Sequence, residues 1–135
     1  MIAVDTNVLV RLLTGDDPEQ TAAARSVFAT GPIWIAKTVL LETGWVLGSL
    51  YGFERSAIHD AFTKLLGLKN VHVEDESSML GAMALTANGI ELADAIHLNS
   101  RPPGAVFLSF DKAFVRRAQR AGASGVSGVP AKGRP

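Results

Sequence analysis

The sequence contains no cysteine, and this absence removes several classes of site at once. A disulfide scaffold, a zinc site with thiolate ligands and a cysteine nucleophile are all excluded. The sequence also lacks an excess of positive charge, because 13 Lys and Arg residues balance 13 Asp and Glu residues. No overall positive field of the kind typical of nucleic-acid binders is therefore expected.

Long apolar segments are missing as well. The longest run without a charged residue, Ser77 to Ile90, is too short to span a bilayer and contains Ser, Thr, Asn and Gly. The chain begins Met1-Ile2-Ala3-Val4-Asp5, without the basic leader of a signal peptide. We therefore expect a cytoplasmic protein without membrane contact.

Length and composition indicate one globular domain. The chain has 135 residues, of which 47% are hydrophobic and 19% charged, enough for one buried core and too few for two domains. We expect a single domain over residues 1–121. The Gly- and Pro-rich end, residues 122–135, is expected to hold one weak strand near Val126 and then a flexible tail.

Short apolar runs alternate with helical patterns along the chain. The runs that predict strands are 2–4, 33–35, 71–73 and 105–109. The patterns that predict helices begin near Val8 and continue over 18–30, 38–50, 55–66, 77–87, 91–100 and 111–121. This alternation predicts an α/β domain with a mostly parallel sheet, in which sites collect just beyond the carboxyl ends of the strands.

Two acids stand directly after predicted strands. Asp5 follows the first strand and Asp111 follows the fourth, and each precedes a helix. Either residue alone is explained equally well as a helix N-cap. Because both strands end on an acid at the same edge of the expected sheet, the pair also indicates a shared site.

Two further acids lie among apolar residues at helical spacing. Glu42 has Val39 three residues before it and Trp45 three residues after it, and Asp94 lies among Ile90, Ala95 and Leu98. This spacing predicts that both carboxylates face the core, where an unpartnered charge costs several kcal/mol. A bound divalent cation would satisfy both, while a position at the helix edge or a hidden salt bridge remains the alternative.

An all-carboxylate set favours Mg²⁺ or Mn²⁺ over zinc or copper. Asp5, Glu42, Asp94 and Asp111 are therefore the candidate metal ligands and catalytic acids of a metal-dependent phosphodiesterase. Three polar neighbours could support them by hydrogen bonds or could serve only in capping and turns; these are Thr6, Asn7 and Ser109.

These motifs resemble one known family. The segments are Val4-Asp5-Thr6-Asn7-Val8-Leu9, Leu40-Leu41-Glu42, Ala93-Asp94-Ala95-Ile96-His97 and Ser109-Phe110-Asp111, and together they resemble the PIN-domain family, closest to the VapC-type toxins of prokaryotic toxin–antitoxin pairs. The resemblance implies a three-layer α/β/α sandwich with a central parallel sheet of about five strands. It also implies a Mg²⁺- or Mn²⁺-dependent endoribonuclease that uses the four acids, forms a homodimer and is inhibited by a cognate antitoxin. Ser109 departs from the pattern, because members of the family often have Thr there.

Two other functions fit parts of the sequence. A PIN fold used as a non-catalytic RNA- or protein-binding module is the main alternative, although such members tend to lose one or more acids and all four are present here. A phosphotransfer enzyme fits less well. A haloacid-type phosphatase needs an acid where Asn7 stands, and a receiver domain needs an acidic pair before Asp5.

Overall fold

The structure is a computed structural model that describes residues 1–131. Three parallel strands begin the fold: β1 (Ile2–Ala3), β2 (Ile33–Ile35) and β3 (Val71–Val73), in the order β1-β2-β3. Ile33 is paired with Ile2 on one side and with Val71 on the other. The two inward-facing residues of β2, Ile33 and Ile35, are fully buried, so the middle strand anchors the core.

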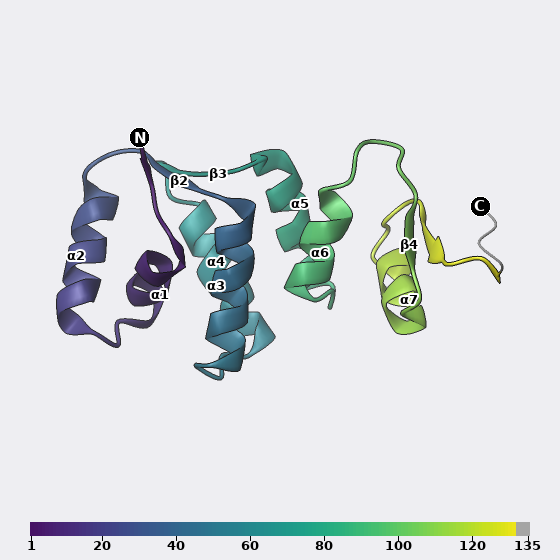
Figure 1. The fold of residues 1–135 in the computed structure, drawn as a ribbon, viewed down its shortest axis with the longest axis horizontal. Coiled ribbons are helices and arrows are strands. Elements are labelled where there is room, and N and C mark those ends of the chain that lie inside the picture. Colours follow the sequence, from purple (N-terminus) through teal and green to yellow (C-terminus); the bar gives the residue numbers. More distant parts are fainter. Residues whose placement is uncertain (132–135) are drawn as a thin grey trace.

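Helices follow each of these strands (Figure 1). Their bounds are α1 (Thr6–Thr14), α2 (Pro18–Ala29), α3 (Lys37–Ser49), α4 (Arg55–Leu66), α5 (Glu76–Ala87), α6 (Leu92–Asn99) and α7 (Lys112–Arg120). We call residues 1–100, with β1 to β3 and α1 to α6, the N-terminal body. Fully buried side chains from several of its helices fill the interior, among them Leu9, Leu40, Leu47, Phe62, Met79 and Leu98. No helix within residues 1–131 is both long enough and apolar enough to cross a membrane.

Residues 101–131 form a second, smaller unit, which we call the C-terminal unit. In it β4 (Phe107–Ser109) pairs in parallel with β5 (Val126–Gly128), and α7 packs against both strands. Phe107 and Phe114 meet edge to face with ring centroids 5.8 Å apart. Figure 1 shows this unit beyond α6, at the opposite end of the molecule from α2.

A single arginine ties the entry of the C-terminal unit to its exit. The Arg101 guanidinium donates hydrogen bonds to the carbonyl oxygens of Ala105, Ser124 and Gly125 at 2.8, 2.6 and 3.1 Å. These bonds fix the Pro102-Pro103 loop beside the start of β5. The loop therefore belongs to the C-terminal unit and leaves the N-terminal body at Ser100.

The predicted α/β sandwich class with parallel strands is confirmed, and five strands are present in residues 1–131. They do not form one continuous sheet, because β1-β2-β3 and β4-β5 are separate sheets. Arg101 holds the connecting loop against the C-terminal unit, so β4 lies away from β1 and the facing edges of both strands stay unpaired. The end of the expected flexible tail, residues 132–135, lies outside the described residues.

Candidate active site

Asp5 lies where β1 passes into α1. Its backbone is extended, and its carboxylate Oδ1 accepts a hydrogen bond from the Val8 backbone N–H at 3.2 Å. Asp5 is therefore the N-cap of α1, as one interpretation of the sequence predicts. The side chain is exposed, so capping leaves the rest of the carboxylate open to a ligand.

Glu42, on α3, is joined to the start of α1 by a side-chain hydrogen bond. The hydroxyl of Thr6 donates to Glu42 Oε1, and Thr6 itself is 9% exposed. Since Thr6 follows Asp5 directly, this bond brings the end of β1 and the middle of α3 together. Thr6 was predicted to support the acids by a hydrogen bond, and the structure joins its hydroxyl to Glu42. We call Asp5 and Glu42 the first acid pair.

The predicted burial of Glu42 is wrong, because its side chain is exposed, as is Trp45 at 61%. The buried face of α3 consists of Leu40, Thr43, Gly44 and Leu47. Gly44 faces inward because α3 packs so closely there that an added Cβ would lie 2.4 Å from a methyl group of Leu92. A threonine and a glycine thus occupy the core side of α3, which apolar spacing alone does not indicate.

Asp94 is half-buried in the first turn of α6, so the predicted burial is partly confirmed. Burial raises the pKa of the Asp94 carboxyl above its ordinary value of 3.8. The positive field of His97 opposes this rise, and the negative charges of Asp111 and Glu91 add to it. Asp111 therefore lies within electrostatic range of Asp94, and we call these two residues the second acid pair.

Asp111 is the N-cap of α7, at the carboxyl end of β4. Its Oδ1 accepts from the Phe114 backbone N–H at 3.0 Å, and the Ser109 hydroxyl accepts from the backbone N–H of Asp111 at 3.0 Å. Ser109 thus shapes the turn that presents Asp111. Asn7 is exposed, and its side chain has no hydrogen bond to another residue in the described chain.

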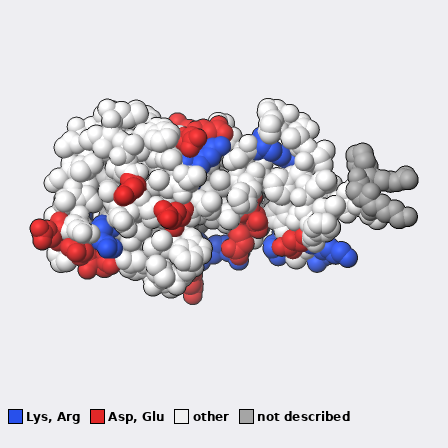
Figure 2. Space-filling view, in the orientation of Figure 1, with Lys and Arg blue, Asp and Glu red and all other residues white. Residues whose placement is uncertain are grey.

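Within residues 1–131 the four acids do not form one cluster. Across residues 1–131, no three Asp, Glu or His side chains lie close enough together to hold one metal ion. On the face that Figure 2 shows, acidic side chains lie in several separate patches. Asp5 follows β1 and Glu42 lies on α3, so both belong to the N-terminal body. Asp94 lies on α6 of the same body, whereas Asp111 lies at the start of α7 in the C-terminal unit.

Comparison with known proteins identifies the family. The family model described as the PIN domain matches residues 2–120. This chain belongs to the PIN-domain family. No curated protein matches the chain. PIN domains are generally nucleases that use divalent metal ions and bind RNA, so the family agrees with the chemistry that four acids indicate.

The donor chemistry of this PIN domain fits a divalent metal. All four candidate ligands are carboxylates, and hard oxygen donors of this kind suit Mg²⁺ or Mn²⁺. The position of the ligands within residues 1–131 does not fit a single ion, because no three of them lie close enough together. A complete site thus requires Asp111 to approach the carboxylates of the N-terminal body.

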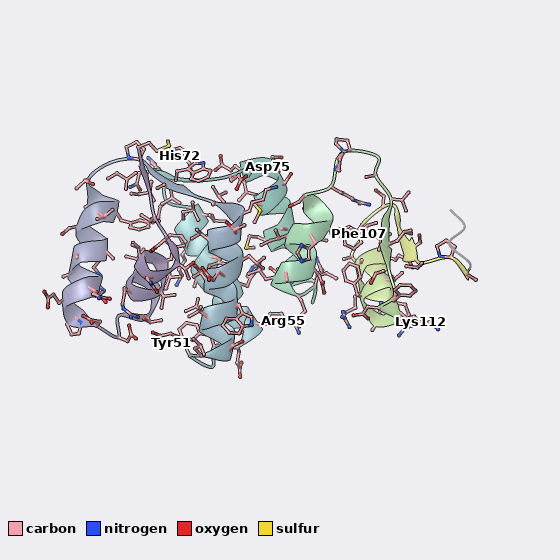
Figure 3. All side chains as sticks on the ribbon, viewed as in Figure 1. Tyr51, Arg55, His72, Asp75, Phe107 and Lys112 are labelled. Carbon is pink, nitrogen blue, oxygen red and sulfur yellow. The ribbon has the colours of Figure 1, made fainter. Side chains whose placement is uncertain are left out.

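A cleft of about 810 Å³ adjoins Glu42 between α3, α4 and the beginning of α6. Its walls include Glu42, Trp45, Phe53, Arg55, His59 and Glu91. Arg55, labelled in Figure 3, forms an ion pair with Glu91 at 3.2 Å and donates to the carbonyl oxygen of Gly89 at 3.0 Å. The sequence patterns do not predict this cleft. The one hint of it in the sequence is Trp45, a large aromatic residue near Glu42.

Proposed function

We propose that this PIN domain is a Mg²⁺- or Mn²⁺-dependent endoribonuclease that uses Asp5, Glu42, Asp94 and Asp111. The observation that carries the proposal is that each acid pair joins residues far apart in sequence: Thr6 links Asp5 to Glu42, and the charge of Asp111 acts on Asp94. Carboxylates held near each other repel unless a cation or a proton compensates them. A divalent cation would supply that compensation.

The residues of the site would divide the work of phosphodiester hydrolysis. The four carboxylates would hold the metal, which supplies Lewis-acid activation of water and stabilises the leaving oxygen. Thr6 would hold the Glu42 carboxylate in one orientation by its hydroxyl hydrogen bond. The Ser109 hydroxyl would fix the backbone turn that presents Asp111.

Cations near the acids would bind the phosphates of RNA. Four cations of the sequence are candidates for this role: Arg11, Lys37, Arg116 and Arg117. Arg11 is engaged in an ion pair with Asp16 at 3.2 Å, and Lys37 binds Asp75 at 3.0 Å and Ser100 at 3.2 Å. We therefore assign phosphate binding to Arg116 and Arg117 on α7. The field of Arg117 lowers the pKa of Asp94, so its guanidinium lies near the second pair.

The resemblance to VapC-type toxins extends the proposal to a biological role. The PIN domain would be the toxin of a type II toxin–antitoxin pair in the cytoplasm, inhibited by an antitoxin whose C-terminal segment covers the acids. Expression of the chain alone in a bacterial host is then expected to arrest growth, and Asp94→Asn to relieve the arrest. Growth arrest by both chains would contradict the toxin role of the site.

The direct test is RNA cleavage by purified protein. A mixed RNA pool is incubated with the protein, free of any antitoxin, in Mn²⁺ and in EDTA. We expect cleavage only with the metal, and we expect Asp94→Asn to abolish it while the circular dichroism spectrum and melting temperature remain those of a folded protein. The matched control is Asp60→Asn, which changes an exposed acid on α4 away from both pairs. Cleavage by Asp94→Asn at the wild-type rate would overturn the assignment.

The separation of the two acid pairs favours one competing function, a PIN fold that binds RNA or protein without catalysis. In that case the wild-type protein would bind an RNA pool equally well in Mn²⁺ and EDTA, and no product would accumulate. The same incubation therefore distinguishes the two functions.

A further inference from the structure

Both short sheets have an unpaired edge lined by exposed apolar residues. Within residues 1–131, β1 pairs only with β2, and β4 pairs only with β5. Ile2 on β1 is 43% exposed, and Leu108 and Phe110 at β4 are 46% and 84% exposed. Unpaired strand edges of this kind are templates for pairing with another strand.

The backbone groups at the two edges are complementary. Ile2 and Val4 donate their N–H groups toward β2, to the carbonyl oxygens of Pro32 and Trp34. Because alternate residues of a parallel strand face the same neighbour, the N–H and C=O of Ala3 point to the open side of β1.

The same alternation applies to β4. Phe107 donates to the Gly125 carbonyl oxygen at 2.7 Å, and the Ser109 carbonyl oxygen accepts from Val129 at 3.3 Å. Both residues therefore face β5, and the N–H and C=O of Leu108 point to the open side of β4. Each edge thus offers one outward donor and one outward acceptor.

A single parallel register of β1 against β4 pairs these backbone groups and also brings Asp5 and Asp111 together. With Ile2 opposite Leu108, the Ala3 N–H can donate to the Leu108 carbonyl oxygen. Asp5 lies two residues after Ala3, the last residue of β1, and Asp111 lies two residues after Ser109, the last residue of β4. Since paired strands are about 4.8 Å apart, this register places Asp111 beside Asp5.

The β4 edge of the same chain is not positioned to reach β1. Figure 1 shows β1 and β4 in separate parts of the long axis of the molecule, with α3, α5 and α6 between them. The hydrogen bonds of Arg101 hold the connecting loop against the C-terminal unit rather than against the N-terminal body. A second copy of the chain has no such restriction.

Charge also favours a second copy as the partner. Acids exceed bases in residues 1–110, whereas α7 carries the bases Lys112, Arg116, Arg117 and Arg120. The C-terminal unit of one copy is therefore electrostatically attracted to the body of another.

We propose that two copies of this chain exchange their C-terminal units, so that β4 of each copy pairs in parallel with β1 of the other. Each completed site then takes Asp5, Glu42 and Asp94 from one copy and Asp111 from its partner. Asp94 stays with the body because α6 packs on α3 through Leu92 and Gly44. The exchange is reciprocal, so it closes as a symmetric dimer. It builds on the acid assignment of the proposed function, but the strand pairing itself is tested without metal or RNA.

The first experiment uses the absence of cysteine in the natural sequence. Chains that carry only Ile2→Cys and only Leu108→Cys are co-expressed with different tags and oxidised. We expect a covalent heterodimer on a non-reducing gel. The matched control replaces Leu108→Cys with Leu68→Cys, an apolar position that is also 46% exposed, and should give no heterodimer. Equal cross-linking at residues 68 and 108, or none at residue 108, would overturn the proposal.

A double variant with both Ile2→Cys and Leu108→Cys on one chain tests whether β4 pairs with β1 of another copy or with β1 of its own chain. Exchange predicts a covalent dimer whose mass is unchanged by dilution before oxidation. A covalently closed monomer would instead show that β4 folds back onto its own β1, and it would reject the exchange.

The second experiment tests the shared site by complementation, with Mn²⁺ binding as the readout. Asp5→Asn and Asp111→Asn are each expected to lose high-affinity Mn²⁺ binding. When the two chains are co-expressed, one of the two sites in each mixed dimer keeps all four acids, so about half of the wild-type Mn²⁺ binding per mixed dimer should return.

The control co-expresses Asp5→Asn with Glu42→Gln, because both changes lie in the N-terminal body and no intact site can form. Recovery in both mixtures or in neither, with metal bound by the wild type, would overturn the shared site. If the wild type binds no Mn²⁺, the proposed function fails while the cysteine experiment still decides the exchange.

Discussion

The N-terminal body and the C-terminal unit reach stability by different means. The body buries a middle strand between two others and surrounds it with six helices, so its core contains fully buried side chains such as Phe62 and Ile35. The C-terminal unit has two strands and one helix, and its buried residues are Phe114, Val115, Ala118 and Val126. Two paired strands and one helix bury little apolar surface, so this unit depends more strongly on contacts with other parts of the protein.

The largest expected effect tests how far the N-terminal body and the C-terminal unit unfold independently, although their buried residues belong to one core cluster. Phe62→Ala and Phe114→Ala should each cost about 3–5 kcal/mol, since both remove a buried ring. Phe62→Ala is expected to lower the protection of amides in β1 to β3 against hydrogen exchange. Phe114→Ala should lower protection only in β4, α7 and β5. If Phe114→Ala also lowers protection in β2 as strongly as Phe62→Ala, the two regions unfold as one unit.

The next largest effect concerns the hydrogen bond from Thr6 to Glu42 inside the N-terminal body. Thr6→Val keeps the size of a buried side chain and removes the hydroxyl that donates to Glu42. We expect RNA cleavage to fall by roughly 10- to 100-fold, which is the usual cost of losing a group that orients a metal ligand. Cleavage assays at saturating Mn²⁺ measure it. Thr63→Val is the control, because the Thr63 hydroxyl contacts only His59 of its own helix, at the carbonyl oxygen and the ring. Equal rates for both variants would deny Thr6 this role.

A smaller effect shows whether Asp5 and Asp111, at the ends of β1 and β4, act only as helix caps or also as metal ligands. Asp5→Asn and Asp111→Asn keep a side-chain oxygen for the cap, so stability should hold while cleavage is lost. Asp5→Ala and Asp111→Ala should lose cleavage and also about 1 kcal/mol of unfolding free energy. Denaturant unfolding and cleavage assays of the four variants give both quantities. Asn variants that cleave at the wild-type rate would leave capping as the whole explanation of these acids.

The smallest expected effect is a pH dependence of stability. Burial raises the pKa of Asp94 above 3.8, so the folded state holds this proton more tightly than the unfolded state. The contribution of Asp94 to stability is therefore most favourable below pH 3.8 and decreases as pH rises through the raised pKa. Asp94→Asn should remove this decrease and be slightly more stable than wild type at neutral pH. Unfolding curves across this range test the sign, and a destabilised Asp94→Asn would contradict it.

Much of the fold and part of the site can be predicted from the sequence because they depend on local signals. Strand ends at Asp5 and Asp111, the caps that these acids form and the alternation of helices with strands all follow from short patterns. The exposure of Glu42 could not be predicted, because the inward face of α3 is decided by the close approach of Leu92 to Gly44. The division of the sheet could not be predicted either. Strand partners are chosen by contacts between distant segments, and periodicity contains no information about which edge remains open.

Lys37 contacts the point at which the chain passes from the N-terminal body to the C-terminal unit. Its ammonium group contacts Asp75, labelled in Figure 3 at the start of α5, and the hydroxyl of Ser100, the last residue before the Arg101 loop. The hydrogen bond from Lys37 lowers the pKa of Asp75. Both side chains reach solvent, and added salt screens such a pair. The contact of Lys37 at Ser100 therefore responds to ionic strength, and added salt is expected to shift the balance between one copy and two in the proposed exchange.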